Sequence, residues 1–360
     1  MCSAPWIITW KNKPARIRTI EAHAQQVGKT GAYVIRFSKF VLVSSLCLIL
    51  ACNDGGVTDR ELDFSSEPVA RGWEDVGIVP RRASSPPGLG QSRVSFAFTS
   101  EIDGASAFRH DLQGIVELFQ LTGAGEPGTT GTQAAVASLE RVSIGRNEKV
   151  HIHADGSSHI HKDPAVSVYA ALMDFPTGGS WGARFILNNG TEDIKPFLLT
   201  FLVQDRKLIS SSGSPIPESR QEIVSDSIPI ATLSSANPPN PEMHSITIAD
   251  ALSRSQPLVI SFITPAFCQS KFCGPVLEEA VNPNFLRYRE SVTFIHIEPY
   301  DIASLQSGSG FQLVDIMTEW NLKTEPWVFV IGSDGKVIVG LEGITNEAEL
   351  ARYIDRALAN

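Results

Sequence analysis

The stretch "PLVISFITPAFCQSKFCGPVLEEAV" (257–281) holds an apolar run, two cysteines and a second apolar run in close succession. Residues 257–264 carry no charge and are rich in β-branched side chains, which predicts a buried strand. The segment "PVLEEAV" (275–281) predicts a helix. Cys268 and Cys273 are therefore expected between the end of a strand and the start of a helix.

The rest of residues 246–360 predicts an alternation of helices and strands in the order β-α-β-α-β-β-α. A hairpin is expected through Ser333-Asp334-Gly335, and Asn346 and Glu349 are spaced like a capping box before the last helix. The first two strands need a crossover helix if they lie parallel. The predicted strands are 257–264, 292–299, 327–332 and 336–343, and the predicted helices are 246–254, 275–281, 311–320 and 346–359.

This order, with two specific segments, resembles the thioredoxin fold. "TPAFCQSKFCGP" (264–275) is similar to cell-envelope thioredoxin-like lipoproteins, and "TEPWVFVIGSDGKVIVGLEG" (324–343) resembles the cis-proline strand and hairpin of membrane-anchored members. The resemblance implies an α/β thioredoxin-like domain over 246–360. It also implies a cis Pro326 opposite the active-site sulfurs, with the Glu325 backbone facing an incoming peptide or thiol.

Two alignments of the cysteines stay open. In the first, Cys268 is the attacking thiol and Cys273 resolves it. In the second, which we favour slightly, Cys273 begins the helix with Pro275 at the first helical position, and Cys268 reaches in from the loop. Five helical residues place side chains ~140° apart, so part of 269–272 is expected to be non-helical when a disulfide closes.

Residues 93–205 alternate like short strands separated by Gly, Pro, Asp and Asn, which predicts a β-sandwich. The pattern of Tyr169, Gly179 and Trp181-Gly182 resembles the immunoglobulin-like modules of bacterial envelope redox proteins. The expected fold class is therefore multi-domain, with an N-terminal antiparallel β-sandwich (Ig-like) followed by an α/β thioredoxin-like domain.

Two segments are expected to lack regular structure. Residues 52–92 predict a flexible tether, because "RRASSPPGLGQSR" (81–93) is rich in Pro, Ser and Gly. Residues 206–245 predict a second, Ser/Pro-rich linker that lets the two domains move independently.

The sequence "VHIHADGSSHIH" (150–161) predicts a hairpin that places four imidazoles on one face. With a loop at 155–157, His153 faces His159 and His151 faces His161. Imidazole is a common ligand of zinc and copper, so these residues are a candidate metal site. The alternative is a polar, solvent-facing hairpin.

The N-terminus predicts a lipoprotein signal peptide over 1–51. A basic segment precedes the apolar run "FVLVSSLCLILA" (40–51), which is too short to span a bilayer as a helix. Ala51-Cys52 resembles a lipobox, which makes Cys52 the lipidated residue; Val34 is an alternative start. The alternatives are a plain signal peptide or a membrane anchor.

Removal of the leader makes the chain strongly acidic. It takes seven of 30 basic and one of 39 acidic side chains, which changes the formal charge from -9 to -15. Nucleic acid is therefore not an expected partner. Only Cys268 and Cys273 then remain as thiols, in a compartment where disulfides persist.

Three functions are compatible with these features. The first is thiol–disulfide exchange outside the cytoplasm, on the periplasmic or outer face of the membrane, with Cys268, Cys273, Glu325 and Pro326 as catalytic residues. Its partners are protein thiols or disulfides, and it requires no cofactor. The second is copper or zinc handling through the dithiol, the His hairpin or both; His296 is considered as a distant ligand, but a hydrogen-bonded strand histidine is favoured. The third is an envelope module whose disulfide is structural.

Overall fold

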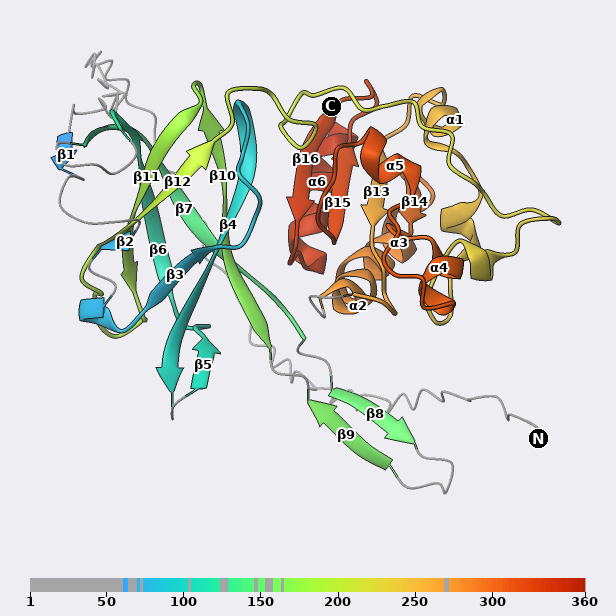
Figure 1. Cartoon of the computed structure of the whole chain (residues 1–360), viewed down its shortest axis with the longest axis horizontal. Coiled ribbons are helices and arrows are strands. Elements are labelled where there is room, and N and C mark those ends of the chain that lie inside the picture. Colours follow the sequence, from blue (N-terminus) through green and yellow to red (C-terminus); the bar gives the residue numbers. More distant parts are fainter. Residues whose placement is uncertain are drawn as a thin grey trace, which may run out of the picture. The chain divides into compact units, whose positions relative to one another are not determined.

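Ten strands form one continuous antiparallel sheet in the N-terminal half of the described chain (Figure 1). The computed structural model describes residues 61–63, 70–71, 74–102, 105–123, 129–145, 148–152, 158–162, 165–268 and 272–359. The strands follow the order β2 (Ala70–Arg71), β12 (Phe197–Val203), β11 (Gly179–Asn188), β6 (Gln113–Leu121), β7 (Thr130–Ile144), β10 (Val166–Phe175), β4 (Gly90–Ile102) and β3 (Val79–Arg82), while β1 (Glu61–Asp63) pairs with β7 and β5 (Ala105–Phe108) with β4.

This sheet curls on itself like a barrel. Strands β4 and β11 are separated by three others in the sheet, yet the rings of Phe96 and Phe185 meet with centroids 5.0 Å apart. Phe175 of β10 likewise meets Trp181 of β11 at 5.1 Å. Edge-to-face aromatic pairs of this kind add to the burial of apolar area. The aromatic core therefore packs together strands that are not neighbours in the sheet.

The prediction of a two-sheet, Ig-like β-sandwich over 93–205 is wrong. A pattern of alternating residues shows which face of a strand is buried, but it does not show whether the strands belong to one sheet or two. Here β7, 15 residues long, pairs with β6 over 131–139 and with β10 over 140–144. This one strand therefore joins both parts into a single sheet.

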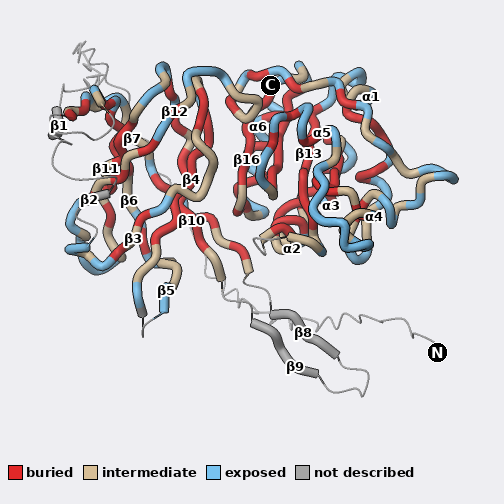
Figure 2. The backbone as a smooth tube through the Cα atoms, in the orientation of Figure 1, coloured by how far each residue is buried: buried red, intermediate tan, exposed pale blue. Residues whose placement is uncertain are grey.

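The C-terminal part forms a four-stranded mixed sheet in the order β14 (Thr293–Ile297), β13 (Leu258–Phe262), β15 (Trp327–Ile331) and β16 (Val337–Glu342). Every residue of the inner strands β13 and β15 is buried (Figure 2). The helices are α1 (Ile248–Leu252), α2 (Cys273–Val276), α3 (Asn282–Tyr288), α4 (Ile302–Gln306), α5 (Asp315–Glu319) and α6 (Glu347–Ala359), with short helical turns η1 (Glu74–Val76), η2 (Ile230–Thr232), η3 (Pro241–His244) and η4 (Leu277–Val281).

The predicted fold class as a whole is also wrong. The described chain is mostly β, with a barrel-like sheet and a small mixed sheet, in place of a β-sandwich followed by an α/β thioredoxin-like domain. Apart from α6 and the continuous helical run formed by α2, the π-helical turn η4 and α3 (Cys273–Tyr288), each α-helix has only five residues. The predicted helix 311–320, for example, is reduced to α5. Helical periodicity in a short window overestimates the helix because packing decides its ends.

Several local predictions in this region are confirmed. Strands β13 and β14 are parallel, and β15 and β16 form the expected hairpin. The turn has Gly335 at φ +74, a conformation that glycine adopts without steric cost. Asn346 caps α6 by accepting a hydrogen bond from the Glu349 amide at 2.9 Å.

Neither predicted flexible segment is free of structure. Within 52–92 the chain already forms β1, β2 and β3 and begins β4. In the 206–245 linker, Ser214 accepts a hydrogen bond from the Val337 amide at 2.9 Å, and Ser219 donates one to Glu319 at 2.6 Å. The described residues of both segments belong to one compact unit. Ser and Pro are used here in ordered loops rather than in a spacer.

A buried ion pair joins the two sheets. The Arg93 guanidinium of β4 donates to both carboxylate oxygens of Glu349 on α6, at 2.7 and 3.0 Å. It also donates to the backbone carbonyls of Glu342 and Ile344, at 3.1 and 2.8 Å. Both side chains are almost fully buried, so their charges are shielded from water and are stabilised by these hydrogen bonds.

Replacement of Arg93 should destabilise the protein strongly. Arg93→Ala leaves a buried, unpaired Glu349 and is expected to cost about 3–5 kcal/mol, as measured by urea unfolding. The Arg352–Glu140 pair offers a matched control, because it also joins α6 to the large sheet but is about half exposed. Arg352→Ala should cost at most about 1 kcal/mol. Equal losses in the two variants contradict this account.

Candidate functional site

The two cysteines lie in and directly after the loop between β13 and α2. Cys268 lies in this loop, Cys273 is the first residue of α2, and the two sulfurs are not joined in a disulfide. Residues 269–271 between them lie outside the described residues. Pro275 is the third helical residue rather than the first, because the helix already begins at Cys273.

The two thiols differ in exposure. Cys273 is completely buried, whereas Cys268 is partly exposed. The Cys273 amide donates a hydrogen bond to the Cys268 sulfur at 3.2 Å. A sulfur that accepts an N–H bond is stabilised as a thiolate, which is the reacting form. This favours the alignment in which Cys268 attacks, and not the slightly preferred alternative with Cys273 as nucleophile.

The surroundings of Cys273 keep its proton bound. Its hydrogen bond to Cys268 raises the pKa of the Cys273 thiol, and so do its burial and the negative charge of Glu325. The pair therefore divides into an accessible sulfur and a buried, protonated one.

Glu325 approaches the sulfurs from the neighbouring strand. The antiparallel register pairs Phe262 with Trp327, so residues that follow β13 lie opposite residues that precede β15. The Glu325–Pro326 peptide is cis, as predicted. The Glu325 carboxylate and the two sulfurs lie within 4.8 Å of one another, and in the described part of the chain this is the one group of Cys, His, Asp and Glu side chains that could hold a metal ion.

Tyr300 completes this cluster and was not predicted. Its hydroxyl donates to Glu325 Oε2 at 2.9 Å. Burial and this hydrogen bond raise the pKa of Tyr300, so the hydroxyl stays a donor. Tyr300 follows β14 in the sequence, and no local motif links it to the cysteines.

The His hairpin exists, but its register differs from the prediction. β8 (Glu148–Ile152) pairs with β9 (Ser158–Lys162) so that His151 lies opposite His159 and Lys149 opposite His161. His153 lies outside the described residues, and no side-chain geometry is described for the hairpin. The pairing is therefore shifted by two positions from the expected one. The metal site at these histidines stays a prediction.

His296 is the hydrogen-bonded strand histidine that we expected. Its Nε2 lies 2.8 Å from the carbonyl oxygen of Ile263, and its ring packs against the ring of His244 with centroids 5.0 Å apart. His244, which sequence reasoning missed, has a buried Nε2 with no partner in the described structure. These two imidazoles form a buried pair separate from the cysteines.

A cavity of about 630 Å³ lies beside this pair. His244, His296, Glu298 and Tyr300 line it, so Tyr300 stands between the cavity and Glu325. Burial raises the pKa of Glu298, whose Oε1 is buried without a partner in the described structure. The cavity is therefore polar but favours uncharged groups.

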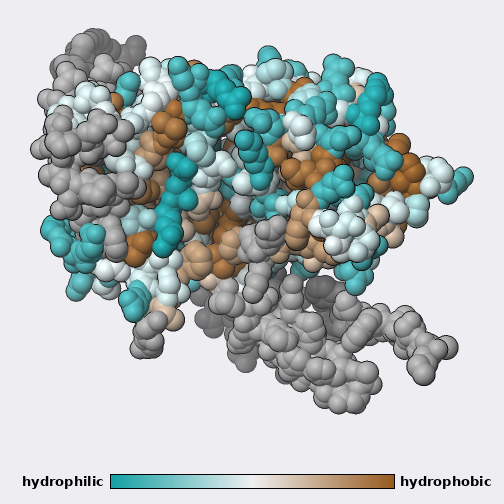
Figure 3. All heavy atoms as spheres, in the orientation of Figure 1, coloured by the Kyte–Doolittle hydropathy of each residue, from teal (hydrophilic) through white to brown (hydrophobic). Residues whose placement is uncertain are grey.

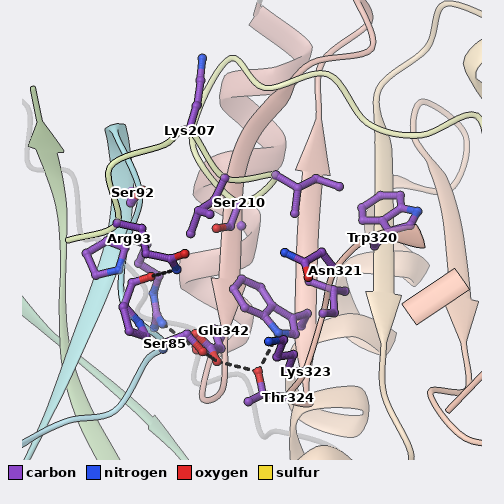
Figure 4. A pocket seen from close by; sticks show the side chains of 18 of the residues that line it. Ser85, Ser92, Arg93, Lys207, Ser210, Trp320, Asn321, Lys323, Thr324 and Glu342 are labelled. Carbon is purple, nitrogen blue, oxygen red and sulfur yellow. Dashed lines mark hydrogen bonds between the residues drawn. The ribbon is translucent and has the colours of Figure 1, made fainter. Parts of the chain in front are cut away.

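A second cavity, of about 450 Å³, is lined by residues from both sheets (Figure 4). At its edge the Glu342 carboxylate accepts hydrogen bonds from Ser85 and Thr324 at 2.6 and 2.7 Å. Lys207 and Lys323 lie on its rim. Neither cysteine lines it, so this cavity is not part of the thiol site.

The predicted lipidation site Cys52 and the leader lie outside the described residues. None of the helices in the described part of the chain has the length and apolar character needed to cross a membrane. No protein-family model and no curated protein matches this sequence. The chemistry of the site must therefore be argued from its own geometry.

Acid should destabilise the protein through the buried imidazoles. Burial lowers the pKa of His244 to about 3 and that of His296 to about 4. An unfolded histidine titrates near pH 6.5, so the unfolded chain binds more protons between pH 6.5 and 4, and stability is lost as the pH falls through this window. Each histidine contributes up to about 1.4 kcal/mol per pH unit.

The measurement is urea unfolding at a series of pH values. His244→Phe should reduce the slope of unfolding free energy against pH by about one proton between pH 6.5 and 4. Burial raises the pKa of Glu298, so this residue makes the unfolding free energy fall as the pH rises above its ordinary pKa. Glu298 is present in both proteins, so its effect cancels in the comparison. An unchanged slope in the variant contradicts a neutral, buried His244.

Proposed function

We propose that this protein carries out thiol–disulfide exchange through Cys268 and Cys273. The observation that supports it best is the difference in exposure and hydrogen bonding between the two thiols. One sulfur is accessible and accepts a backbone N–H bond, and the other is buried behind it and protonated. Resolution of a mixed disulfide requires an attacking and a resolving thiol of this kind.

The reaction proceeds in two exchanges. The Cys268 thiolate attacks one sulfur of a substrate disulfide, the substrate S–S bond breaks, and its second sulfur leaves as a thiolate. Cys273 then loses its proton and attacks the Cys268 sulfur, which releases the first substrate sulfur as a thiolate. The protein dithiol is oxidised to a disulfide by two electrons, and the substrate disulfide is reduced to two thiols.

Glu325 is suited to the second exchange. Its carboxylate lies within 4.8 Å of both sulfurs and can accept the proton that Cys273 must lose. Tyr300 holds one of its oxygens by a 2.9 Å hydrogen bond, so the carboxylate is oriented before the reaction.

The surface beside the site can contact a peptide. Phe311, 52% exposed, packs edge-on against Tyr300 with ring centroids 5.1 Å apart, and Leu313 is 42% exposed. Figure 3 shows that hydrophobic residues also occur in patches between hydrophilic ones on the face it presents. Exposed apolar side chains beside Tyr300, the hydrogen-bond partner of Glu325, favour a protein substrate over a small hydrophilic thiol.

The N-terminal pattern supports a location outside the cytoplasm. The basic segment, the short apolar run and Ala51-Cys52 are typical of a lipoprotein leader, and Cys52 would then anchor the protein to a membrane. In such a compartment a dithiol meets disulfide substrates.

Single substitutions of the two cysteines should have opposite effects. Cys273→Ser removes the resolving thiol, so mixed disulfides through Cys268 should accumulate and appear as higher-mass bands on non-reducing gels. Cys268→Ser should trap no partner, because the remaining thiol is buried. Cys2→Ser, Cys47→Ser and Cys52→Ser in both variants remove the other thiols of the chain.

The trapped species should disappear when the sample is reduced. Two results contradict the proposal: equal trapping by both variants, or no trapping by either together with similar losses of melting temperature. The second result is the behaviour of a structural disulfide.

A further inference from the structure

We infer that the reduced site binds one zinc ion through Cys268, Cys273 and Glu325. The two sulfurs and one carboxylate oxygen already lie within 4.8 Å of one another. Tetrahedral zinc with Zn–S of about 2.3 Å and Zn–O of about 2.0–2.2 Å places its ligands about 3.5–3.8 Å apart. Small side-chain rotations are therefore enough to close the site around the ion.

The donor set selects the metal. Thiolates bind zinc and copper(I) alike, but a carboxylate oxygen is a ligand that zinc accepts and soft copper(I) does not favour. Calcium and magnesium prefer oxygen ligands alone. Two thiolates and one carboxylate thus point to a divalent, borderline-soft ion, for which zinc is the common choice.

Tyr300 acts as the outer partner of the carboxylate. Its hydroxyl donates a hydrogen bond to Glu325 Oε2 at 2.9 Å. Hydrogen bonds of this kind orient metal-ligating groups and tune their affinity. The arrangement thus has both a ligand set and a supporting contact.

The site is open on one side. Cys273 is completely buried, whereas Cys268 and Glu325 are partly exposed, so the ion can enter past these two residues. Three protein ligands leave the fourth tetrahedral position for water or for a ligand from another molecule.

Metal binding and exchange exclude each other. Binding of Zn²⁺ displaces the thiol protons and changes no oxidation state, and a sulfur bound to the ion is not free to attack a disulfide. The inference goes beyond the proposed function, because it requires only that both thiols be reduced. Zinc would hold the dithiol in its reduced form until the metal is removed.

The test is a titration with Co²⁺, which reports thiolate ligation by strong charge-transfer absorption, followed by displacement with Zn²⁺. The reduced full chain is used without oxygen. The background removes all other thiols and the His hairpin with Cys2→Ser, Cys47→Ser, Cys52→Ser, His151→Ala, His153→Ala, His159→Ala and His161→Ala.

One Co²⁺ per chain should bind and give the spectrum of a tetrahedral thiolate site. Cys268→Ser and Cys273→Ser should each abolish the charge-transfer band. Glu325→Gln should weaken zinc binding about tenfold or more. Glu290→Gln, at an exposed glutamate 91% accessible, is the matched control and should change nothing.

Two outcomes overturn the inference: binding that is not stoichiometric, or equal affinity in the Glu325→Gln and Glu290→Gln proteins. The second outcome reduces the site to a plain dithiol chelate. Mixed-disulfide trapping by Cys273→Ser is measured separately, so a failure of metal binding leaves the exchange reaction standing and the reverse also holds.

Discussion

The buried Arg93–Glu349 pair is the constraint on which the arrangement of the site depends. Arg93 also binds the carbonyls of Glu342 and Ile344, so it holds the chain just after β16. In that same turn the Gly343 amide donates to the Pro326 carbonyl at 2.8 Å. Arg93 thus binds the residues on either side of Gly343, and Gly343 binds Pro326, the residue next to Glu325. An ion pair between the sheets thus helps to position a carboxylate at the thiols.

The sheet of the C-terminal part brings the remaining groups together. β13 runs antiparallel to β15, so the loop that carries Cys268 and the peptide that carries Glu325 meet at the same end of these two strands. Tyr300 comes from the loop after β14, the parallel neighbour of β13 on its other side. Three chain segments far apart in sequence therefore converge at the ends of three adjacent strands.

Local patterns predicted much of this region. The family resemblance implied the cis bond at Pro326. The apolar run that becomes β13, the hairpin turn at Gly335 and the cap at Asn346 were visible in the sequence itself. Each depends on a few neighbouring residues. Long-range choices were not visible. Alternation in the N-terminal half did not show that one sheet closes on itself, and a Ser/Pro-rich segment was misread as a spacer because its partners lie elsewhere in the chain.

The site was predicted in the same uneven way. The two cysteines and Glu325 were identified from sequence, but the order of the thiols was not, because burial of Cys273 depends on the packing of α2. Tyr300 and the role of Glu349 could not be found, since both depend on residues distant in sequence. In the His hairpin the register, which the loop length sets, placed His151 rather than His153 opposite His159.

The central claim is that Cys268 and Cys273 form a disulfide that opens and closes in function. Equilibration of the purified protein with glutathione or dithiothreitol buffers, read by thiol alkylation, gives the reduction potential of the pair. An exchanging dithiol should have a potential between about -270 and -120 mV. A value below about -300 mV, where structural disulfides lie, would contradict the account.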